Sequence, residues 1–429
     1  MSARIVMASA WFPPYDLGGT EVYVDGLIRA LHSIGFDCTV LAPRAEGAPD
    51  QYSHDGIVVE TYRVGEKLDD TGVEEFSRLL SHHAGAIFHL HSWTRGCGPA
   101  HLARARALGF DTVVTVHTPA ALCMRGTMRL YGGAACDGRI DAVRCAACRA
   151  QARGAPAPIA QMLAHIPETL ARRARAFPFG AGLGVRALAM EKQQELQNLF
   201  SDADRVVAVC RWLEAALREN GAPGGKLSVS RQGLPMRWLN APTLAEKAPT
   251  EALRLVFLGR FDVVKGVDTI VMALRRLPHD CAIDLTIHAV ASTEEERAFE
   301  AHVRALAGDD ARIAIAPPLR PDEAPARLRD FDAMVIPSRW METGPLTALE
   351  ARASGLVIVG SRLGGIAEIA DENEGDILVA PDDVAAWAKA IAGLALRKRQ
   401  GAMPHDVRPV RGMNDVAMDM RALYRGFAA

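Results

Sequence analysis

Short apolar runs alternate with amphipathic stretches along almost the whole chain of 429 residues. Residues 5–10 form a first strand-like run, and residues 22–31 carry apolar side chains at helical spacing. This order of strand and helix is typical of βαβ units around a parallel sheet. Later strand-like runs in the first half of the chain lie at 38–42, 86–91, 112–117, 206–209 and 227–230.

The alternation restarts after a polar, proline-bearing stretch at 240–249, which is the best candidate for a linker. The pattern therefore predicts two doubly wound α/β domains, 1–240 and 241–429. Ligands of such sheets bind beyond the carboxyl ends of the strands, so the expected site is the cleft between the domains. Strand-like runs in the second half lie at 253–258, 283–289, 311–316, 333–337 and 356–359.

The composition is that of an ordinary globular protein, with 49% hydrophobic and 23% charged residues. A formal net charge of −2 provides no overall attraction to nucleic acid, and none is expected as a partner. The first residues lack the pattern of a secretory signal, and no apolar run approaches the roughly 18 residues of a membrane span. We therefore expect a cytoplasmic protein.

Two glutamates, Glu342 and Glu350, are separated by seven residues and follow the apolar run 333–337. Gly344, between them, gives the backbone a wider choice of conformations. Pro345 suits the first position of a helix, because its missing N–H would be unpaired there. A helix start favours a diphosphate, whereas an ionised carboxylate only accepts hydrogen bonds. The pattern predicts that the glutamates bind hydroxyl groups of a ribose or hexose. The alternative is a capped surface helix with solvated glutamates.

Two cations, Arg260 and Lys265, lie on a glycine-bracketed loop after the run 253–258. Cations so placed can flank a diphosphate and stabilise the negative charge of a leaving group. A basic loop with solvated side chains is the alternative. His117 ends another strand-like run, a position where histidine more often packs than reacts.

These residues form a recognisable set together with Gly364-Gly365 and the run Gly18-Gly19-Thr-Glu21. The chain resembles, nearly end to end, the retaining glycosyltransferases of the GT-B fold, and most closely those of glycosyltransferase family four (the glycogen synthase-like and mannosyltransferase-like group). The resemblance implies two Rossmann-like domains that face a central cleft. The N-terminal domain would take the acceptor and the C-terminal domain the nucleotide-sugar donor. A last helix at about 413–427 would pack back on the N-terminal domain.

The resemblance also implies a role for each matching residue. Arg260 and Lys265 would bind the donor diphosphate as it leaves, Glu342 would hold hydroxyls of the donor sugar, and Glu350 would hold the ribose. The other implied contacts with the donor come from His117 near the reacting sugar, from Gly18 and Gly19 near the phosphates, and from the backbone around Gly344, Pro345 and Leu346.

The reaction implied is transfer of a sugar, with retention, from a nucleoside-diphosphate sugar to a saccharide or lipid-linked saccharide acceptor. Such a reaction belongs to polysaccharide or glycoconjugate biosynthesis and needs no cofactor. Thr118 departs from the family pattern, since relatives often carry aspartate there. The sequence leaves open the donor, the acceptor and the oligomeric state. The alternatives are a catalytically silent nucleotide-sugar-binding protein and a nucleotide-sugar epimerase of the same fold.

An insertion at about 119–200 is rich in cysteine and arginine. Four thiolates can close a tetrahedral structural zinc site, and free thiols, an iron–sulfur cluster or disulfides are the alternatives. The arginines raise a further hypothesis, in which a basic face contacts an anionic membrane or a lipid diphosphate from the cytoplasmic side; a solvated basic helix is its alternative. The cysteines of the expected metal site are Cys123, Cys136, Cys145 and Cys148.

Overall fold

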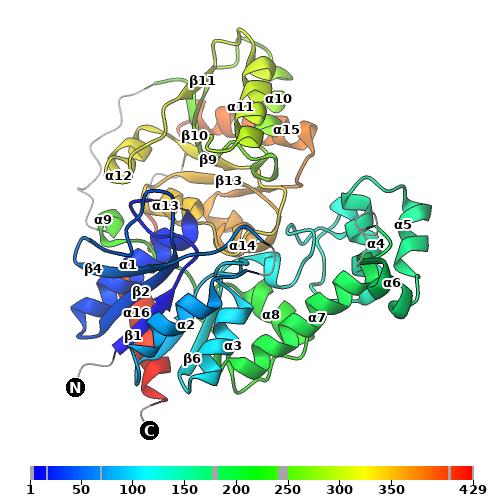
Figure 1. The fold of residues 1–429 in the computed structure, drawn as a ribbon. Coiled ribbons are helices and arrows are strands. Elements are labelled where there is room, and N and C mark those ends of the chain that lie inside the picture. Colours follow the sequence, from blue (N-terminus) through cyan, green and yellow to red (C-terminus); the bar gives the residue numbers. More distant parts are fainter. Residues whose placement is uncertain are drawn as a thin grey trace. The chain divides into compact units, whose positions relative to one another are not determined.

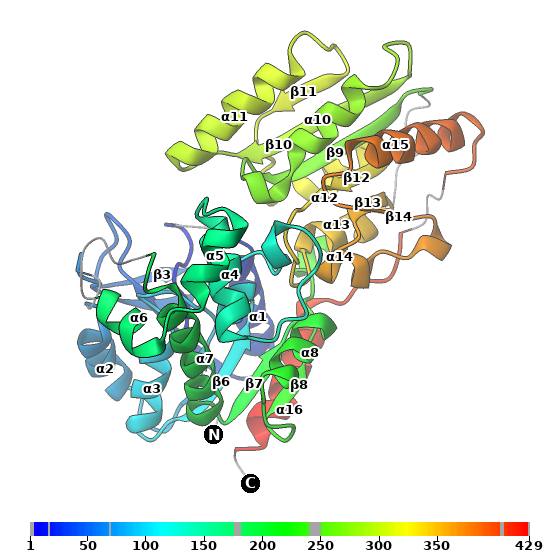
Figure 2. The ribbon, with the colours of Figure 1, turned by 90° about the vertical axis from the view of Figure 1, so that its right-hand side faces the viewer.

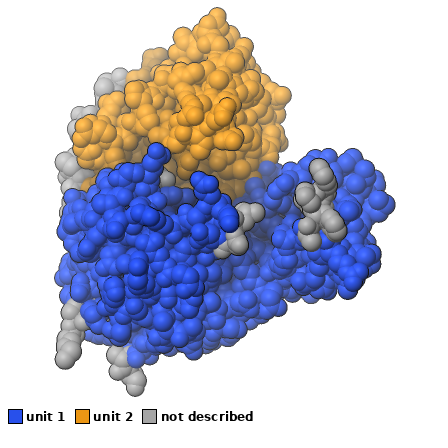
Figure 3. All heavy atoms as spheres, viewed as in Figure 1, with its two compact units in different colours: residues 1–232, 413–429 blue, residues 233–412 orange. Residues whose placement is uncertain are grey.

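The chain divides into two compact units, which Figure 3 colours separately. Unit 1 comprises Met1–Gln232 and Met413–Ala429, and unit 2 comprises Gly233–Gly412. The linker candidate at 240–249 lies outside the described residues. The computed structural model describes residues 4–15, 18–67, 70–175, 182–239, 250–403 and 407–427.

The described part of unit 1 contains an eight-stranded sheet with the order β3-β4-β2-β1-β5-β6-β7-β8. All neighbouring strands are parallel except β3 and β4, which form an antiparallel pair. The central strands are apolar along their length because helices cover both faces of a parallel sheet. The strands are β1 Arg4–Ala8, β2 Asp37–Pro43, β3 Gln51–His54, β4 Ile57–Tyr62, β5 Ile87–Leu90, β6 Asp111–Val116, β7 Arg205–Ala208 and β8 Leu227–Val229.

Helix α16 (Met413–Arg425) closes unit 1 by packing on α1 (Gly19–Ser33). The contact is tight because Gly26 has no side chain: a Cβ there would lie 2.9 Å from Cγ of Met413. Met413, Val416 and the apolar face of α1 share one buried core with β1 and β2. The other helices on the sheet of unit 1 are α2 Val73–Ser81, α3 Pro99–Ala107 and α8 Arg211–Glu219.

Helices α4 to α6 form a lobe set apart from this sheet, as Figure 1 shows; in Figure 2 the same helices lie in front of the sheet. Helix α7 connects these helices to the rest of unit 1, since it packs on α3 as well as on α4, α5 and α6. We call residues 119–202 the lobe. Its described helices are α4 Ala142–Ala152, α5 Ala157–Ala164, α6 Glu168–Arg175 and α7 Val185–Asp202, and two short 3-10 turns, η1 Pro119–Ala121 and η2 Leu130–Gly132, precede them.

Unit 2 contains a six-stranded sheet that is parallel throughout its described residues, with the order β11-β10-β9-β12-β13-β14 (Figure 1). Its strands are β9 Leu253–Arg260, β10 Ile283–Val290, β11 Ile313–Ala316, β12 Ala333–Ile336, β13 Val357–Ser361 and β14 Ile377–Val379. Its helices are α9 Met236–Leu239, α10 Val267–Arg275, α11 Glu294–Ala307, α12 Ala324–Arg327, α13 Leu346–Ala353, α14 Gly364–Ile369 and α15 Val384–Arg399, and its 3-10 turns are η3 Val263–Lys265, η4 Leu328–Asp330 and η5 Glu372–Glu374.

The predicted fold class is confirmed, since both units are parallel α/β sheets with crossover helices. The predicted strands occur within a few residues of their expected positions, although His91 and His117 follow β5 and β6 instead of ending them. The β3–β4 hairpin was not predicted. Among the described residues, no helix has both the length and the apolar character that crossing a bilayer requires.

Candidate active site

The loop after β9 carries the two predicted cations. Arg260 is the last residue of β9, and its Nε donates to Oε1 of Glu296 at 2.7 Å. Lys265 ends the turn η3, and Gly266 follows it in the left-handed region at φ 70°. A Cβ on Gly266 would lie 2.2 Å from the carbonyl oxygen of Pro337. Glycine is therefore required for this loop to lie against the end of β12.

Glu342 and Lys265 meet beyond the carboxyl ends of β9 and β12. Lys265 Nζ donates to Glu342 Oε1 at 2.8 Å, and Ser338 Oγ donates to the same oxygen at 2.7 Å. The Lys265 ammonium also lies 5.2 Å from the ring centre of Trp340, a cation–π contact. The Glu342 side chain is only 7% exposed. The carboxylate is thus fixed in place by two donors, while the lysine keeps access to solvent.

The diglycine packs directly against the backbone around Glu342. Gly365 N–H donates to the carbonyl oxygen of Glu342 at 2.6 Å. A Cβ on Gly365 would lie 2.4 Å from the amide nitrogen of Gly344, and Gly364 adopts φ 49° beside the same loop. Gly344 itself has φ 109°. Glycines at these three positions allow the loop and the start of α14 to approach each other closely.

Helix α13 begins directly after this loop. Pro345 is its N-cap and Leu346 its first helical residue, so the expectation that Pro345 occupies the first helical position is wrong by one residue. The carbonyl oxygen of Pro345 accepts a hydrogen bond from Ala348 N–H, and this bond begins the backbone hydrogen bonding of the helix. The eight-residue helix directs its N-terminal amides toward the loop of Glu342 and Gly344.

Glu350 lies further along α13 and is partly buried. Burial raises its pKa to about 7, and the positive charge of Arg237 on α9 acts in the opposite direction. The carboxyl group is therefore about half protonated near neutral pH. It can donate a hydrogen bond as well as accept one.

His117 belongs to a buried histidine cluster in unit 1. Its Nε2 lies 3.1 Å from Nδ1 of His91, and its ring meets Tyr23 edge-on with centroids 4.7 Å apart. Burial lowers the pKa of His117 to about 3 and lowers that of His91 well below its usual value. Both imidazoles are therefore neutral near pH 7, and His117 can offer a hydrogen bond but not a positive charge.

A cavity of about 80 Å³ lies beyond the carboxyl ends of β5 and β6. His117 and His91 line it, and hydroxyl, carboxylate and indole groups surround them. This lining combines neutral hydrogen-bonding groups with aromatic rings, which suits a hydroxylated ligand. The other lining residues are Trp11, Thr20, Glu21, Ser92, Trp93, Thr94, Thr115, Val116 and Thr118.

The N-terminal diglycine has a local structural role. Gly18 is the N-cap of α1, and its N–H donates to Glu21 Oε2 at 2.9 Å. A Cβ on Gly18 would lie 2.6 Å from that oxygen, whereas nothing described lies within 4 Å of a Cβ on Gly19. The neighbouring residues 16–17 are outside the described part, so the geometry supports a constraint at Gly18 only.

Sequence reasoning missed four residues that hold the predicted ones in place. Ser338 and Trp340 lie on the same loop as Glu342, so their closeness to Glu342 could have been inferred from the sequence. Glu296 completes a capping box with Thr293 at the start of α11, a sequence signature that does not by itself indicate Arg260. His91 ends the strand-like run 86–91 but was not predicted as a site residue, although its ring lies within hydrogen-bond distance of His117.

The chain contains two Asp-x-Asp sequences, Asp202-Ala-Asp204 and Asp330-Phe-Asp332, and the last aspartate of each has a structural role. Asp204 accepts hydrogen bonds from Arg106 and from the Thr112 backbone, and fully buried Asp332 pairs with Arg254 and Lys398. These contacts occupy carboxylates that would otherwise suggest a metal-dependent transferase.

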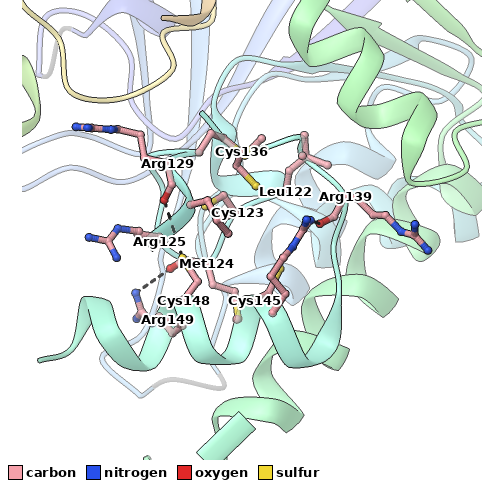
Figure 4. A pocket seen from close by; sticks show the side chains of 14 residues that line it. Leu122, Cys123, Met124, Arg125, Arg129, Cys136, Arg139, Cys145, Cys148 and Arg149 are labelled. Atoms are coloured by element: carbon pink, nitrogen blue, oxygen red, sulfur yellow. Dashed lines mark hydrogen bonds between the residues drawn. The ribbon is translucent and has the colours of Figure 1, made fainter. Parts of the chain in front are cut away.

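The four cysteines of the predicted zinc site line one small cavity in the lobe (Figure 4). All four are free thiols, and within the described ranges no three His, Cys, Asp or Glu side chains are grouped so that they could hold a metal ion. The predicted zinc therefore has no coordination sphere here. Several lobe arginines have partners within the lobe, which reduces the predicted basic face; these pairs are Arg144–Asp137, Arg172–Glu168 and Arg175–Glu191.

Two family models match the chain and together cover more than half of it. "Glycosyltransferase Family 4" matches residues 17–150, and "Glycosyl transferases group 1" matches residues 252–396. The first match contains α1 and strands β2 to β6 and extends into the lobe. The second contains the loop of Arg260, the Glu342–Glu350 segment and the diglycine.

Curated relatives are glycosyltransferases. A D-inositol 3-phosphate glycosyltransferase of Corynebacterium efficiens is 30% identical over 232 residues, 51% of this chain and 51% of its own length. A glycogen synthase of Mycobacterium tuberculosis is 26% identical over 398 residues, 90% of this chain and 85% of its own length. The chain thus spans about half the length of the first relative and most of the second.

Solved structures share the fold over the whole chain. Sucrose-phosphate synthase of Thermosynechococcus elongatus has a TM-score of 0.63 at 18% identity and covers 99% of both chains. The Anabaena protein HepE, in a complex with UDP and glucose, has a TM-score of 0.62 at 12% identity and covers 98% of this chain and 99% of its own. The two family models place the chain among the glycosyltransferases, with a family 4 N-terminal part and a group 1 C-terminal part, and the solved structures share its GT-B fold.

Proposed function

We propose that this protein transfers a sugar, with retention at the anomeric carbon, from a nucleoside-diphosphate sugar to a saccharide or lipid-linked saccharide acceptor. Unit 2 would bind the donor and unit 1 the acceptor. The observation that carries the proposal is the Lys265–Glu342 pair at the ends of β9 and β12, next to the start of α13. It supplies a cation for phosphate, a carboxylate for hydroxyls and a helix N-terminus within one loop system.

Each group has a distinct part in this proposal. Arg260 and Lys265 would bind the diphosphate and stabilise the charge that grows on it as the glycosidic bond breaks. Glu342, with its partner Ser338, would hold hydroxyls of the donor sugar. Glu350 would bind the ribose, and its raised pKa lets it meet the ribose hydroxyls as donor or acceptor.

His117 would act as a neutral hydrogen-bonding group near the reacting sugar. Its lowered pKa argues against a role as a proton donor near pH 7. Gly18, at the start of α1, would let the first loop approach a phosphate. A uridine donor is the first to test, because HepE has been solved with UDP and glucose.

The test is release of free nucleoside diphosphate from a panel of UDP-, GDP-, TDP- and ADP-sugars. Wild type is compared with Glu342→Ala and with a control, Glu300→Ala, which removes a half-buried carboxylate paired with Arg304 on α11. Donor-selective release that is lost in Glu342→Ala and kept in the control supports the proposal. Product analysis by NMR then assigns the anomeric configuration, and an inverted product overturns the retaining assignment.

A silent nucleotide-sugar-binding protein gives a different result. It would be stabilised against heat by one nucleotide in the panel but would release no diphosphate, even with a mixture of saccharide acceptors present. That outcome would reject transfer while retaining the donor site.

A further inference from the structure

A cavity in unit 1 contains buried polar groups without partners in the described part of the chain. His91 and Trp93 follow β5, and both line the cavity of about 80 Å³ beyond the carboxyl ends of β5 and β6. His91 is only 1% exposed, yet its Nε2 has no hydrogen-bond partner among the described residues, and the same holds for the buried Nε1 of Trp93. Buried polar groups are nearly always paired with protein, water or ligand, so these two atoms indicate a partner that enters the cavity.

A buried chain of hydrogen bonds orients a third group of this cavity, the Thr115 hydroxyl. The Tyr424 hydroxyl oxygen lies 2.6 Å from Nδ1 of His89, and His89 Nε2 lies 2.8 Å from Oγ1 of Thr115. Burial lowers the pKa of His89 to about 3, so its ring is neutral and has one donor and one acceptor. Because a phenol is a stronger acid than an imidazole N–H, Tyr424 donates to Nδ1 and Nε2–H donates to Thr115. The hydroxyl hydrogen of Thr115, which lines the cavity, is thereby left for another acceptor.

The lining of the cavity carries little charge. His91 and His117 are neutral near pH 7, because burial lowers the pKa of both. Among the described residues that line the cavity, Glu21 is the one with a formal charge, and its carboxylate accepts from Gly18 N–H at 2.9 Å. A phosphate or carboxylate group that entered the cavity would therefore meet a like charge, with no cation in the described lining to offset it.

Two tryptophans give the cavity apolar faces. Trp11 is 48% exposed and Trp93 is partly buried, and both contribute to the lining. The ammonium of Lys192 on α7 lies 5.5 Å from the ring centre of Trp93, and it pairs with Glu195 at 2.8 Å, so its charge is already partnered. A sugar ring has apolar C–H faces and hydroxyl groups at its edge. Indole faces beside neutral donors and acceptors match that combination.

We propose that this cavity receives an uncharged, hydroxylated part of the acceptor, the edge of an unphosphorylated sugar residue, and excludes phosphate and carboxylate groups. The inference rests on the proposed function, which supplies the acceptor, and adds the chemical class of its accepting end. His91 Nε2, Trp93 Nε1 and the Thr115 hydroxyl bind the sugar hydroxyls, and Trp11 packs on the ring. In a lipid-linked acceptor the phosphates lie outside this cavity.

The first test compares neutral and phosphorylated probes on the full-length wild-type protein. Binding of glucose, mannose, galactose and myo-inositol is measured by ligand-observed NMR at pH 8 without any nucleotide sugar, beside the 6-phosphates of the three hexoses and inositol 3-phosphate. The inference predicts that at least one neutral probe binds and that its phosphorylated counterpart binds at least about tenfold more weakly. Equal or tighter binding of the phosphorylated probe, or no binding of any neutral probe, overturns it.

The second test assigns that binding to the cavity. Thr115→Val and Trp93→Phe each remove one hydrogen-bonding group, and each should weaken binding of the neutral probe by about three- to tenfold. Thr39→Val on β2 is the matched control, since it removes a half-buried hydroxyl that does not line the cavity. Unchanged affinity in both cavity variants overturns the inference and makes water the partner of these groups. Trp93→Phe decides the test if Thr115→Val, which removes a partner of buried His89, fails to fold.

Failure of this inference can be told apart from failure of the proposed function, because both tests measure binding and neither requires transfer. A protein that binds neutral probes in the cavity but releases no nucleoside diphosphate from any donor keeps this binding site and loses the transferase proposal. A protein that releases diphosphate selectively but binds phosphorylated probes as well as neutral ones keeps the transferase proposal and loses the neutral-acceptor assignment.

Discussion

Glu350 allows a sharp test of the donor half of the site through pH. The substitution Glu350→Gln keeps the size of the side chain and removes its titration. In wild type, burial raises the pKa from 4.5 in the unfolded chain to about 7 in the folded one. Between these values the folded state binds more protons than the unfolded state, so stability falls as pH rises.

The magnitude follows from the same two values. Each pH unit between 4.5 and about 7 costs about 1.4 kcal/mol, which gives about 3 kcal/mol as an upper limit. Because Glu350 is only partly buried, solvent screening lowers the expected effect to about 1–3 kcal/mol. Glu350→Gln should therefore gain this amount of stability relative to wild type as pH rises from 4.5 to 7.5, and the gap should then stay constant.

The assay is equilibrium denaturation of the full chain in guanidinium chloride at half-unit pH intervals, with the m-value monitored for each variant. Glu300→Gln on α11 serves as the matched control, since it removes a half-buried glutamate and leaves Glu350 intact. A Glu350→Gln gap that stays constant from pH 4.5 to 7.5, or one that grows toward acid, would refute the burial of this carboxyl group.

Four further outcomes are expected. Gly365→Ala should lower stability by about 1–3 kcal/mol, since its Cβ would lie 2.4 Å from a backbone nitrogen, whereas Gly393→Ala in the open face of α15 should be neutral or stabilising in the same denaturation assay. Lys265→Ala should reduce turnover more than donor affinity in steady-state kinetics, and a pure loss of affinity would argue against stabilisation of the leaving group. Ser338→Ala should cost about 1 kcal/mol of stability through its lost bond to the site carboxylate, and an unchanged denaturation midpoint would show that this bond contributes nothing. Glu350→Ala should weaken donor binding by about 1–3 kcal/mol in calorimetry, and an unchanged affinity would defeat the ribose assignment.

The fold could largely be predicted from the sequence, because the strands of a parallel sheet that is buried on both faces are apolar along their whole length. β9, β10 and β12 follow from that pattern alone. The β3–β4 hairpin was missed because its outer strand, Gln51–His54, alternates exposed and half-buried polar residues and carries no apolar run. Pairing at a sheet edge depends on the neighbouring strand, which the local sequence does not reveal.

The part of the candidate site that lies around the Glu342 loop could be predicted from the sequence. Glu342, Gly344 and the diglycine are close in sequence, and their spacing indicated a constrained loop. The pairing of Arg260 with Glu296 could not be predicted, because the two residues belong to different crossover units and are distant in sequence. The protonation of Glu350 was also hidden, since it depends on burial along α13 and not on residue type.

The contact between Lys265 and Glu342 bears on how a donor would enter the site. In the ligand-free chain each charge satisfies the other, so the buried carboxylate is never left without a partner. A diphosphate that draws the lysine away would remove one hydrogen-bond donor from Glu342, and a sugar hydroxyl could then take its place. Binding of the phosphate and of the sugar would thus be coupled through one carboxylate. Double-mutant cycles between Lys265→Ala and Glu342→Gln, measured with UDP and with the UDP-sugar, should show a coupling energy that changes between the two ligands, and an identical coupling for both would refute this exchange.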